Sequence, residues 1–387
     1  MPDMLEADVK SAQGLRSFNF CREYNHGEQA QMSAGSTIPA DRGRRLLSLW
    51  AERGYDLERL LRRSTISREL LASRNGRFTQ PQFTAFFRSA AVILRDESWG
   101  LCPSRIPVGT FPMICRAAIT QPTLGRVLSS GLANYRVVTR DFTARVNTTA
   151  PMVRVTLRDV IPDPDARRQF HATFMFFLYS LMCWTTEKRI PLQAVHFVFS
   201  ASEASEELAR AFRAPVHYNS EQTELIFEKR CLRLPNVQDP QACEQLLSQC
   251  PGALAVAFDD KTNATERVRR YLRTHLVDRN SLQHTAAHLR TSAATLRRRL
   301  AEDGTNFQKL KDEVRRDISI NLLVETNMRL EDLAGRVGFL EVSAFHRAFR
   351  RWTGCAPSDY RSGNSGDGRG AAVKSCPDPE WMSETVR

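Results

Sequence analysis

The residues of this sequence that could do chemistry are arginines in two short stretches near its C-terminus, Thr285–Leu300 and Leu330–Trp352. The first stretch reads TAAHLRTSAATLRRRL, in which Arg297 and Arg298 directly follow Leu296. A helix that buries the leucines turns these two guanidinium groups outward, where they can bind a guanine edge or a phosphate. A solvated basic face is the plainer interpretation of an arginine run, but the surrounding pattern favours contact with nucleic acid.

The two stretches form an internal repeat with a spacing of 49 residues, found by aligning Leu296 with Phe345. The outward positions of the two helices then correspond in three pairs. These pairs are Ala294 with Ser343, Arg297 with His346, and Arg298 with Arg347. Two basic helices held at a fixed separation suit two successive major-groove segments of DNA. His346 could instead be an inert surface histidine, and Arg299 is expected to face a phosphate or solvent.

Short helices and tight turns must hold these side chains in place. Ser281 is a predicted N-cap of the first scaffold helix, and Ser292 is a predicted N-cap of the recognition helix Ala293–Glu302. Gly338 fits a turn that needs a positive φ before the second recognition helix. Thr265 is the predicted cap of an earlier helix. A long helix with one apolar stripe joins the two units, and that stripe consists of Phe307, Leu310, Val314, Ile318 and Leu322.

Three submotifs of the second unit occur in order. They are A-x-x-x-G-F at Ala334–Phe339, F-x-R-x-F at Phe345–Phe349 and G-x-x-P-x-x-Y-R at Gly354–Arg361. With these motifs the last quarter of the chain resembles the DNA-binding domain of AraC/XylS-type transcription regulators. The resemblance implies an all-α domain with two helix-turn-helix units joined by a long helix. It also implies DNA contact at the three outward positions of the second unit.

The sequence departs from that family pattern at the helix caps of the second unit. Leu340 and Glu341 stand where small polar capping residues are usual, and Arg329 replaces the cap of the second scaffold helix. Glutamate is a poor N-cap, although its charge suits the positive end of a helix dipole. We therefore expect the first unit to make the stronger contacts with DNA. Trp352, Pro357 and Tyr360 are predicted to close the core of this domain.

A second resemblance covers the preceding part of the chain. Pro107–Gly125 reads PVGTFPMICRAAITQPTLG, and Phe176–Trp184 reads FFLYSLMCW. These stretches resemble the N-terminal sensor region, similar to an arabinose-binding domain, of a subgroup of AraC-type regulators. The resemblance implies a domain that binds a small effector or dimerises, without identifying the effector.

The chain has 387 residues, enough for two domains, and a formal net charge of +12 at pH 7. Residues 263–361 contain 19 Lys and Arg against 12 Asp and Glu, whereas the rest of the chain contains 36 against 31. The larger share of the net positive charge, +7 of +12, thus lies in residues 263–361, as a polyanion-binding domain requires.

No catalytic or metal-binding pattern is found in the sequence. The nine cysteines are scattered without a CxxC pair, and the usual phosphate-loop, zinc-protease and nucleophile-elbow motifs are absent. His171, His196 and His217 are isolated, and each is expected to be a core or surface histidine. Without a secretory leader, and with a longest apolar run of only Phe174–Trp184, we expect a reduced cytosolic protein with no cofactor, no metal and no membrane span.

The region before the repeat is predicted to be an α+β domain. Helices are expected from Thr37–Pro39 onward, over Asp56–Leu61 and Gln80–Asp96, and over Ala166–Lys188. Predicted strands are Tyr135–Val138, a hairpin of Phe142–Val146 and Met152–Arg158, and the runs Val195–Phe199, Pro215–Tyr218 and Leu225–Phe227. Aromatic residues between Phe170 and Phe199 are expected to form core, and part of that cluster could line a ligand pocket.

Composition then suggests the domain boundaries. We expect a disordered leader over 1–36, a sensor and dimerisation domain over 37–258 and a linker over 259–264. The DNA-binding domain is expected over 265–361, with its helix-turn-helix units at 281–303 and 329–352, followed by a disordered tail over 362–387.

The hypothesis that fits best is a sequence-specific transcription regulator, an effector-responsive activator that binds double-stranded promoter DNA as a homodimer and acts with RNA polymerase. One alternative is an effector-independent architectural protein whose first domain only oligomerises. An alkyl-transfer repair enzyme is disfavoured, because that chemistry needs a metal-bound cysteine cluster that this sequence lacks.

Overall fold

The computed structural model describes residues 36–64, 66, 68–201, 211–255, 264–276 and 281–362. An N-terminal α+β region precedes a C-terminal helical region, as the sequence predicts. The predicted leader and tail, and most of the predicted linker, lie outside the described residues. Among the helices that are described, none combines the length and the apolar character needed to cross a bilayer.

The described part of the N-terminal region starts with a small strand pair and four helices. These are β1 (Ile38–Pro39), α1 (Asp41–Glu52), α2 (Leu57–Ser64), α3 (Arg68–Ala72), β2 (Arg77–Phe78) and α4 (Gln80–Leu94). The helix predicted from Thr37–Pro39 onward is present as α1, but it begins later, at Asp41, because Ile38–Pro39 form β1, which pairs with β2. A residue before proline is pushed toward extended backbone, which explains the strand at Ile38. Asp56 caps α2 as predicted, accepting a hydrogen bond from the Arg59 amide at 2.9 Å.

The described residues of the N-terminal region form five further helices, some before the main-sheet strands in the sequence and some after or between them. They are α5 (Thr110–Ile119), α6 (Leu124–Val138), α7 (Pro164–Thr186), α9 (Pro240–Gln249) and α10 (Gly252–Ala255). The predicted strand at Tyr135–Val138 was wrong, since these residues form the last turn of α6. Leu124, Val127, Leu128 and Leu132 are buried at helical spacing, and their packing overrides the strand propensity of the final Val-Val pair. The prediction of α7 is confirmed.

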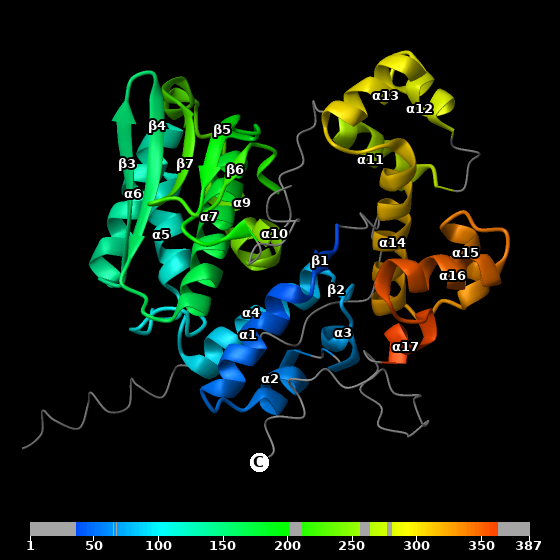
Figure 1. The fold of residues 1–387 in the computed structure, drawn as a ribbon, viewed down its shortest axis with the longest axis horizontal. Helices are drawn as coiled ribbons and strands as arrows, with labels where there is room; N and C mark the ends of the chain where they lie inside the picture. The colour runs from blue at the N-terminus through cyan, green and yellow to red at the C-terminus, as the bar shows by residue number, and fades with distance from the viewer. Residues whose placement is uncertain are drawn as a thin grey trace, which may run out of the picture. The chain divides into compact units, whose positions relative to one another are not determined.

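The main sheet has five strands in the order β3-β4-β7-β5-β6. They are β3 (Phe142–Thr149), β4 (Met152–Asp159), β5 (Leu192–His196), β6 (Val216–His217) and β7 (Thr223–Glu228), and a short 3-10 helix follows at Lys229–Arg233. The β3–β4 hairpin is confirmed, with Thr149 paired to Met152, whereas β5 and β6 are parallel rather than antiparallel. The predicted strand Val195–Phe199 extends too far, because β5 ends at His196. Helices α6 and α7 lie behind the sheet, on one face, in Figure 1.

The C-terminal region is entirely helical. Its elements are α11 (Ala264–Thr274), α12 (Leu282–His288), α13 (Ala293–Glu302), α14 (Phe307–Glu325), α15 (Leu330–Arg336), α16 (Val342–Thr353) and α17 (Pro357–Ser362). Figure 1 shows α14 running from the group α11–α13 to the group α15–α17. Four of the five predicted stripe residues of α14 are buried, and Phe307 is half-buried. Thr265 was wrongly predicted as a cap, because α11 starts one residue earlier and the Thr265 hydroxyl donates to Asp303.

Candidate nucleic-acid interface

The first helix-turn-helix unit has a side-chain cap at each helix start, as predicted. Ser281 Oγ accepts a hydrogen bond from the His284 amide at 3.2 Å, and Ser292 Oγ accepts one from the Thr295 amide at 3.1 Å. Each bond satisfies an amide that a helix start otherwise leaves without a partner. Leu296 is 1 % exposed and anchors α13 in the core. The recognition helix of this unit is therefore held firmly in one orientation.

The outward face of α13 carries the residues proposed from the sequence. Ala294, Arg297 and Arg298 are all exposed, and Arg299 is exposed beside them. Arg298 lies 3.8 Å from Glu302, but both side chains are mostly solvated, and such a pair adds little to stability. Arg297 forms no ion pair with any residue that the structure describes. The guanidinium groups of this face are thus available to an incoming anion.

The second unit lacks both side-chain caps, as its sequence predicts. Arg329 precedes α15 and Glu341 precedes α16, and neither side chain accepts a capping hydrogen bond from a backbone amide of its helix. Arg329 instead pairs with Asp332 at 3.1 Å, and Glu341 accepts from the Ser343 hydroxyl at 3.2 Å. The helix still packs firmly, because Phe345 and Phe349 are both fully buried. Anchoring of this recognition helix therefore comes from its aromatic face.

Three predicted contact residues of the second unit lie on one face of α16. Ser343 and Arg347 are exposed, and His346 is half-buried with its ring edge-on to Phe345. Arg350 is exposed on the same face, since it follows Arg347 by three positions and Ser343 by seven. Sequence reasoning missed Arg350, although the spacing alone was sufficient to identify it.

The turns of the two units share one geometry. Arg290 has φ 54° and Gly338 has φ 78°, so each turn contains one left-handed residue. The amide of Arg290 donates to Ala287 O, and the next amide, that of Thr291, donates to Ala286 O. Gly338 and Phe339 repeat this pattern with Gly335 and Ala334. The second turn is one residue longer before its recognition helix, because α16 begins four residues after Gly338 whereas α13 begins three after Arg290.

A half-buried arginine braces each turn from the preceding helix. Arg267 of α11 donates to Leu289 O at 3.1 Å, and Arg315 of α14 donates to Gly338 O at 2.8 Å. The Arg315 guanidinium also lies 4.7 Å from the centre of the Phe339 ring, and burial lowers the pKa of Arg315. The repeat therefore extends beyond the helix-turn-helix stretches to the helix that precedes each of them.

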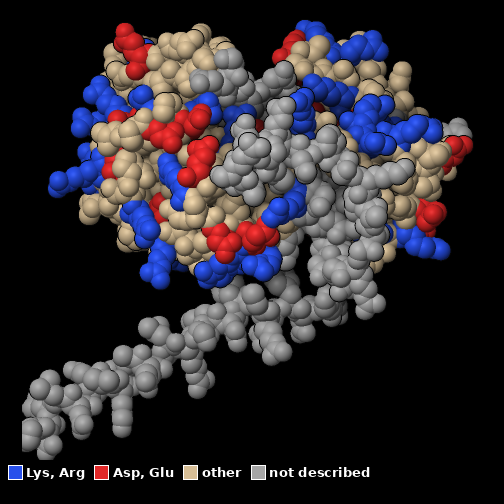
Figure 2. Space-filling view, turned by 60° about the horizontal axis from the view of Figure 1, so that its bottom comes forward, with Lys and Arg blue, Asp and Glu red and all other residues tan. Residues whose placement is uncertain are grey.

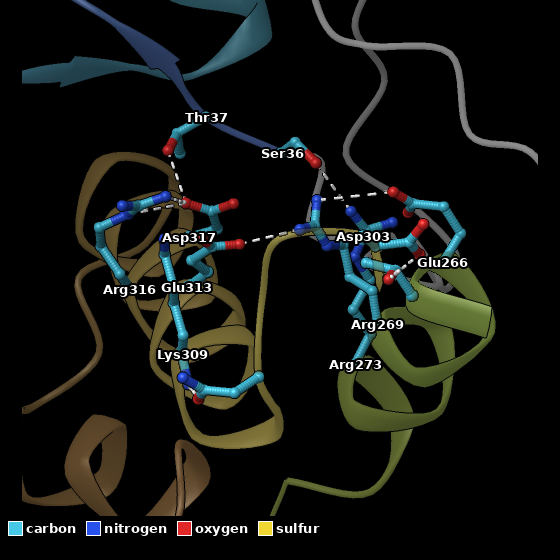
Figure 3. A network of polar contacts seen from close by, with 12 residues as sticks. Ser36, Thr37, Glu266, Arg269, Arg273, Asp303, Lys309, Glu313, Arg316 and Asp317 are labelled. Atoms are coloured by element: carbon cyan, nitrogen blue, oxygen red, sulfur yellow. Dashed lines mark hydrogen bonds and ion pairs between the residues drawn. The ribbon is translucent and has the colours of Figure 1, made fainter. Parts of the chain in front are cut away.

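Figure 3 shows the polar contacts that join α11 to α14. Arg269 of α11 reaches Glu313 of α14, with 2.8 Å between Nη2 and Oε2. At Asp317 of α14, Thr37 donates a hydrogen bond of 2.6 Å and Arg316 lies at 3.0 Å. Burial alone would raise the pKa of Asp317, but Arg316, the nearby Arg77 and the Thr37 hydroxyl outweigh burial and lower it. Asp317 is thus a buried carboxylate that stays charged.

The surface charge agrees with a polyanion partner. Figure 2 shows a broad group of Lys and Arg side chains on the right-hand part of the drawn face, with few Asp and Glu between them. Among the described residues, no group of three or more His, Cys, Asp and Glu is arranged to hold a metal ion, and no disulfide joins the described cysteines.

The three histidines singled out in the sequence occupy structural positions. His171 is buried, with Nε2 2.8 Å from Asp159 and Nδ1 2.7 Å from the Thr223 hydroxyl. His196 and His217 lie on the parallel strands β5 and β6 with ring centres 4.7 Å apart. Burial lowers the pKa of His196.

The N-terminal region contains an apolar cavity of about 250 Å³. Its walls come from α4, α5, α6, α7, α9 and α10, from the start of β3 and from the loop between α4 and α5. Phe170, Phe174 and Phe177 line it, so part of the predicted aromatic cluster does form a pocket, whereas Phe176 and Tyr179 lie in the surrounding core.

Comparisons with known families match both regions of the chain. Residues 54–236 match the family described as the arabinose-binding domain of AraC transcription regulators, N-terminal. Residues 285–363 match a helix-turn-helix domain. These are the two resemblances expected from the sequence motifs.

Individual relatives agree with the family matches. The chain is 31 % identical over 335 residues to the ornithine utilization regulator of Pseudomonas aeruginosa, covering 84 % of this chain and 96 % of that protein. It is 35 % identical over 82 residues to the regulator VqsM of the same species, covering 21 % of this chain and 25 % of that protein. The solved structure of the transcriptional regulator CdpR, also from P. aeruginosa, aligns with 71 % of this chain and 96 % of its own at 22 % identity and a TM-score of 0.29. These relatives are regulators by name rather than enzymes.

Proposed function

The chain belongs to the AraC family of DNA-binding transcription regulators, with an N-terminal ligand-binding domain, and from this premise we propose that it reads two neighbouring major-groove segments of double-stranded DNA. One segment is read by α13 and the other by α16. The observation that carries the proposal is the shared turn geometry of the two units, each braced by a half-buried arginine. Such bracing fixes the direction of both recognition helices before DNA arrives.

Each proposed contact residue has a role that follows from its chemistry. Arg297 and Arg298 donate to guanine edges or phosphates, because their forked guanidinium groups match both. In the second unit, Arg347 does the same, and Ser343 and His346 add single hydrogen bonds. Ala294 has no polar group and lets the start of α13 approach the bases closely.

The wider regulatory assembly is also part of the proposal. Residues 37–258 form the sensor and dimerisation domain, 259–264 the linker and 265–361 the DNA-binding domain. Two copies of the chain then place four recognition helices on a promoter, where they recruit RNA polymerase as an activator does. This assembly works in the cytoplasm of a bacterial cell, where the promoter DNA lies.

Binding to a DNA fragment from the chain's own upstream region tests the proposed contacts. We expect Arg297→Ala and Arg298→Ala each to weaken binding by about 1–3 kcal/mol and to weaken it more than His346→Ala. Arg336→Ala is the matched control, because Arg336 is exposed on the scaffold helix α15. Equal losses at all three contact positions would contradict the ranking, and an equal loss at Arg336 would contradict the assignment of the recognition face.

Effector dependence separates this proposal from an architectural protein whose first domain only oligomerises. The apolar cavity favours an effector, since a purely oligomerising domain gains stability by filling such a space. Thermal unfolding across a panel of metabolites provides the measurement. A ligand at 100 times its dissociation constant adds about 2.7 kcal/mol to the free energy of unfolding. No shift with any compound, together with unchanged DNA binding, would favour the architectural function.

A further inference from the structure

The chemistry of the cavity wall restricts what the N-terminal domain can bind. Most lining side chains are aromatic or aliphatic, and Phe87, Phe111, Leu128, Phe174 and Leu254 are examples from five different elements. A ligand with many hydroxyl groups, such as a sugar, would lose hydrogen bonds to water that such a wall does not replace. The wall therefore selects against strongly polar molecules.

The two charged residues in the wall are already bonded to protein backbone. Glu97 accepts hydrogen bonds from the amides of Gly109 and Phe111, at 2.6 and 2.7 Å, where α5 begins. Arg88 donates to the carbonyls of Leu247, Ser248 and Cys250, where α9 ends. Each charge thus neutralises one helix end. Neither is available to a charged ligand without giving up its helix.

The remaining polar side chains of the wall differ in their availability. Ser98 donates to Asp96, and the Thr185 hydroxyl donates to Leu181 O at 2.8 Å. Thr173 lies within α7, where a hydroxyl can turn back to the carbonyl one turn earlier. The Tyr135 hydroxyl has no hydrogen-bond partner among the described residues, and burial raises the pKa of Tyr135, so it remains a donor.

We propose that this cavity binds an uncharged, mostly apolar small molecule of about bicyclic size, whose one ketone or hydroxyl group is recognised by Tyr135. The size follows from comparison with a 150 Å³ apolar cavity, which holds one benzene ring, because 250 Å³ is larger by about two thirds. This inference deepens the proposed effector-responsive function and rests on it.

One helix of the cavity wall, α10, is the last described helix before the DNA-binding region. Leu254 of α10 lines the cavity, and the chain continues from α10 through residues 256–263 into α11. Helix α10 is held against α4, because the Gly252 amide donates to the Thr84 hydroxyl at 3.1 Å and a Cβ at Gly252 would lie 2.4 Å from that oxygen. A ligand that fills the cavity fixes the helix from which the DNA-binding region departs.

Three bicyclic probes of nearly equal shape test the inference on the full-length chain without DNA. They are 1-tetralone, tetralin and tetralin-1-carboxylate, and binding is followed by titration calorimetry and by the fluorescence of Trp99, which lines the cavity. We expect tetralone to bind about fivefold more tightly than tetralin, the difference of one hydrogen bond. L-Ornithine is added as a strongly polar comparison. Tetralin-1-carboxylate and L-ornithine should each bind at least 100-fold more weakly than 1-tetralone.

Variants locate the site and the hydrogen bond. Tyr135→Phe should bind tetralone and tetralin equally, and Ala118→Leu, which fills the cavity, should weaken both by at least tenfold. Ala117→Leu is the matched control, because Ala117 is exposed on the same helix. Tighter binding of the carboxylate or ornithine, no binding of any bicyclic probe, or undiminished binding by Ala118→Leu would overturn the inference. Tyr135→Phe still tests it if Ala118→Leu fails to fold. DNA binding by the ligand-free chain is measured separately, so its loss would count against the proposed function alone.

Discussion

Substituting alanine for Gly338 should unfold the second helix-turn-helix unit, which contains α16. The first unit, which contains α13, should stay intact. Gly338 has φ 78°, a conformation in which a side chain is strained. A Cβ at this position would lie 2.6 Å from the carbonyl oxygen of Leu276 and 3.1 Å from Arg315 Nη2. The Leu276 oxygen belongs to the backbone, so it cannot retreat without moving the end of the preceding segment.

The expected loss follows from these two effects. The left-handed conformation costs an alanine about 1–2 kcal/mol, and overpacking against a backbone atom adds about 1–3 kcal/mol. The lower entropy of the unfolded chain offsets about 0.5–1 kcal/mol of this. We expect the free energy of unfolding to fall by about 2–3 kcal/mol. Gly335→Ala, three residues away in α15, should raise it by about 0.5–1 kcal/mol, because a Cβ there meets nothing within 4 Å.

Urea unfolding of the two variants and the unsubstituted chain, followed by footprinting on one DNA fragment, measures both consequences. Gly338→Ala should lose protection over the segment read by α16 and keep it over the segment read by α13. The reasoning would be refuted if Gly338→Ala and Gly335→Ala differed by less than about 1 kcal/mol, since the strain at φ 78° alone predicts more.

Other substitutions probe the remaining features of the structure. Arg290→Gly should raise the free energy of unfolding by about 0.5–1 kcal/mol in thermal melts, because Arg290 has φ 54°; a lower melting temperature would contradict this. Arg350→Ala should make the plot of log binding constant against log salt concentration less steep, by about 0.9 in slope, if one phosphate contact is lost. An unchanged slope would show that Arg350 does not contact a phosphate. Asp159→Asn should cost about 3 kcal/mol at neutral pH, because Asp159 is buried beside His171. Burial alone would raise the pKa of Asp159, but the hydrogen bonds from His171, Ile161 and Arg167 outweigh burial and lower it. The unsubstituted chain should therefore lose this stability as the pH falls below about 4. The free energy of unfolding of the Asp159→Asn variant should change less over the same acid range.

The recognition helices were predictable because their signals are local. Ser292 caps α13, and Leu296 and Phe345 are buried where the apolar spacing places them. A cap and a helical period depend on residues within one turn of each other, so a single sequence contains the necessary information. The predicted hairpin of β3 and β4 succeeded for the same reason.

Features that depend on distant partners could not be predicted. Tyr135–Val138 has strand propensity but is helical, because the buried face of α6 extends into it. The bracing of Gly338 by Arg315 joins residues 23 positions apart, and Arg315 resembles any other arginine of the connecting helix in the sequence. The cavity depends on six helices, and only the packed structure shows that Glu97 and Arg88 are already committed to helix ends.

The two helix-turn-helix units differ less in stability than their helix caps suggest. The second unit lacks a side-chain cap before α16, and a missing cap costs about 1 kcal/mol. The first unit has its caps but places Arg290 where the second has Gly338, and a left-handed arginine costs a similar amount. Each unit thus contains unfavourable residues, since Arg329 also leaves α15 without a side-chain cap, and each turn is braced by an arginine from the preceding helix. Differences in DNA binding between the units should therefore follow the exposed arginines of α13 and α16 rather than the stability of the helices, which is why Arg297 and Arg298 are expected to matter more than His346.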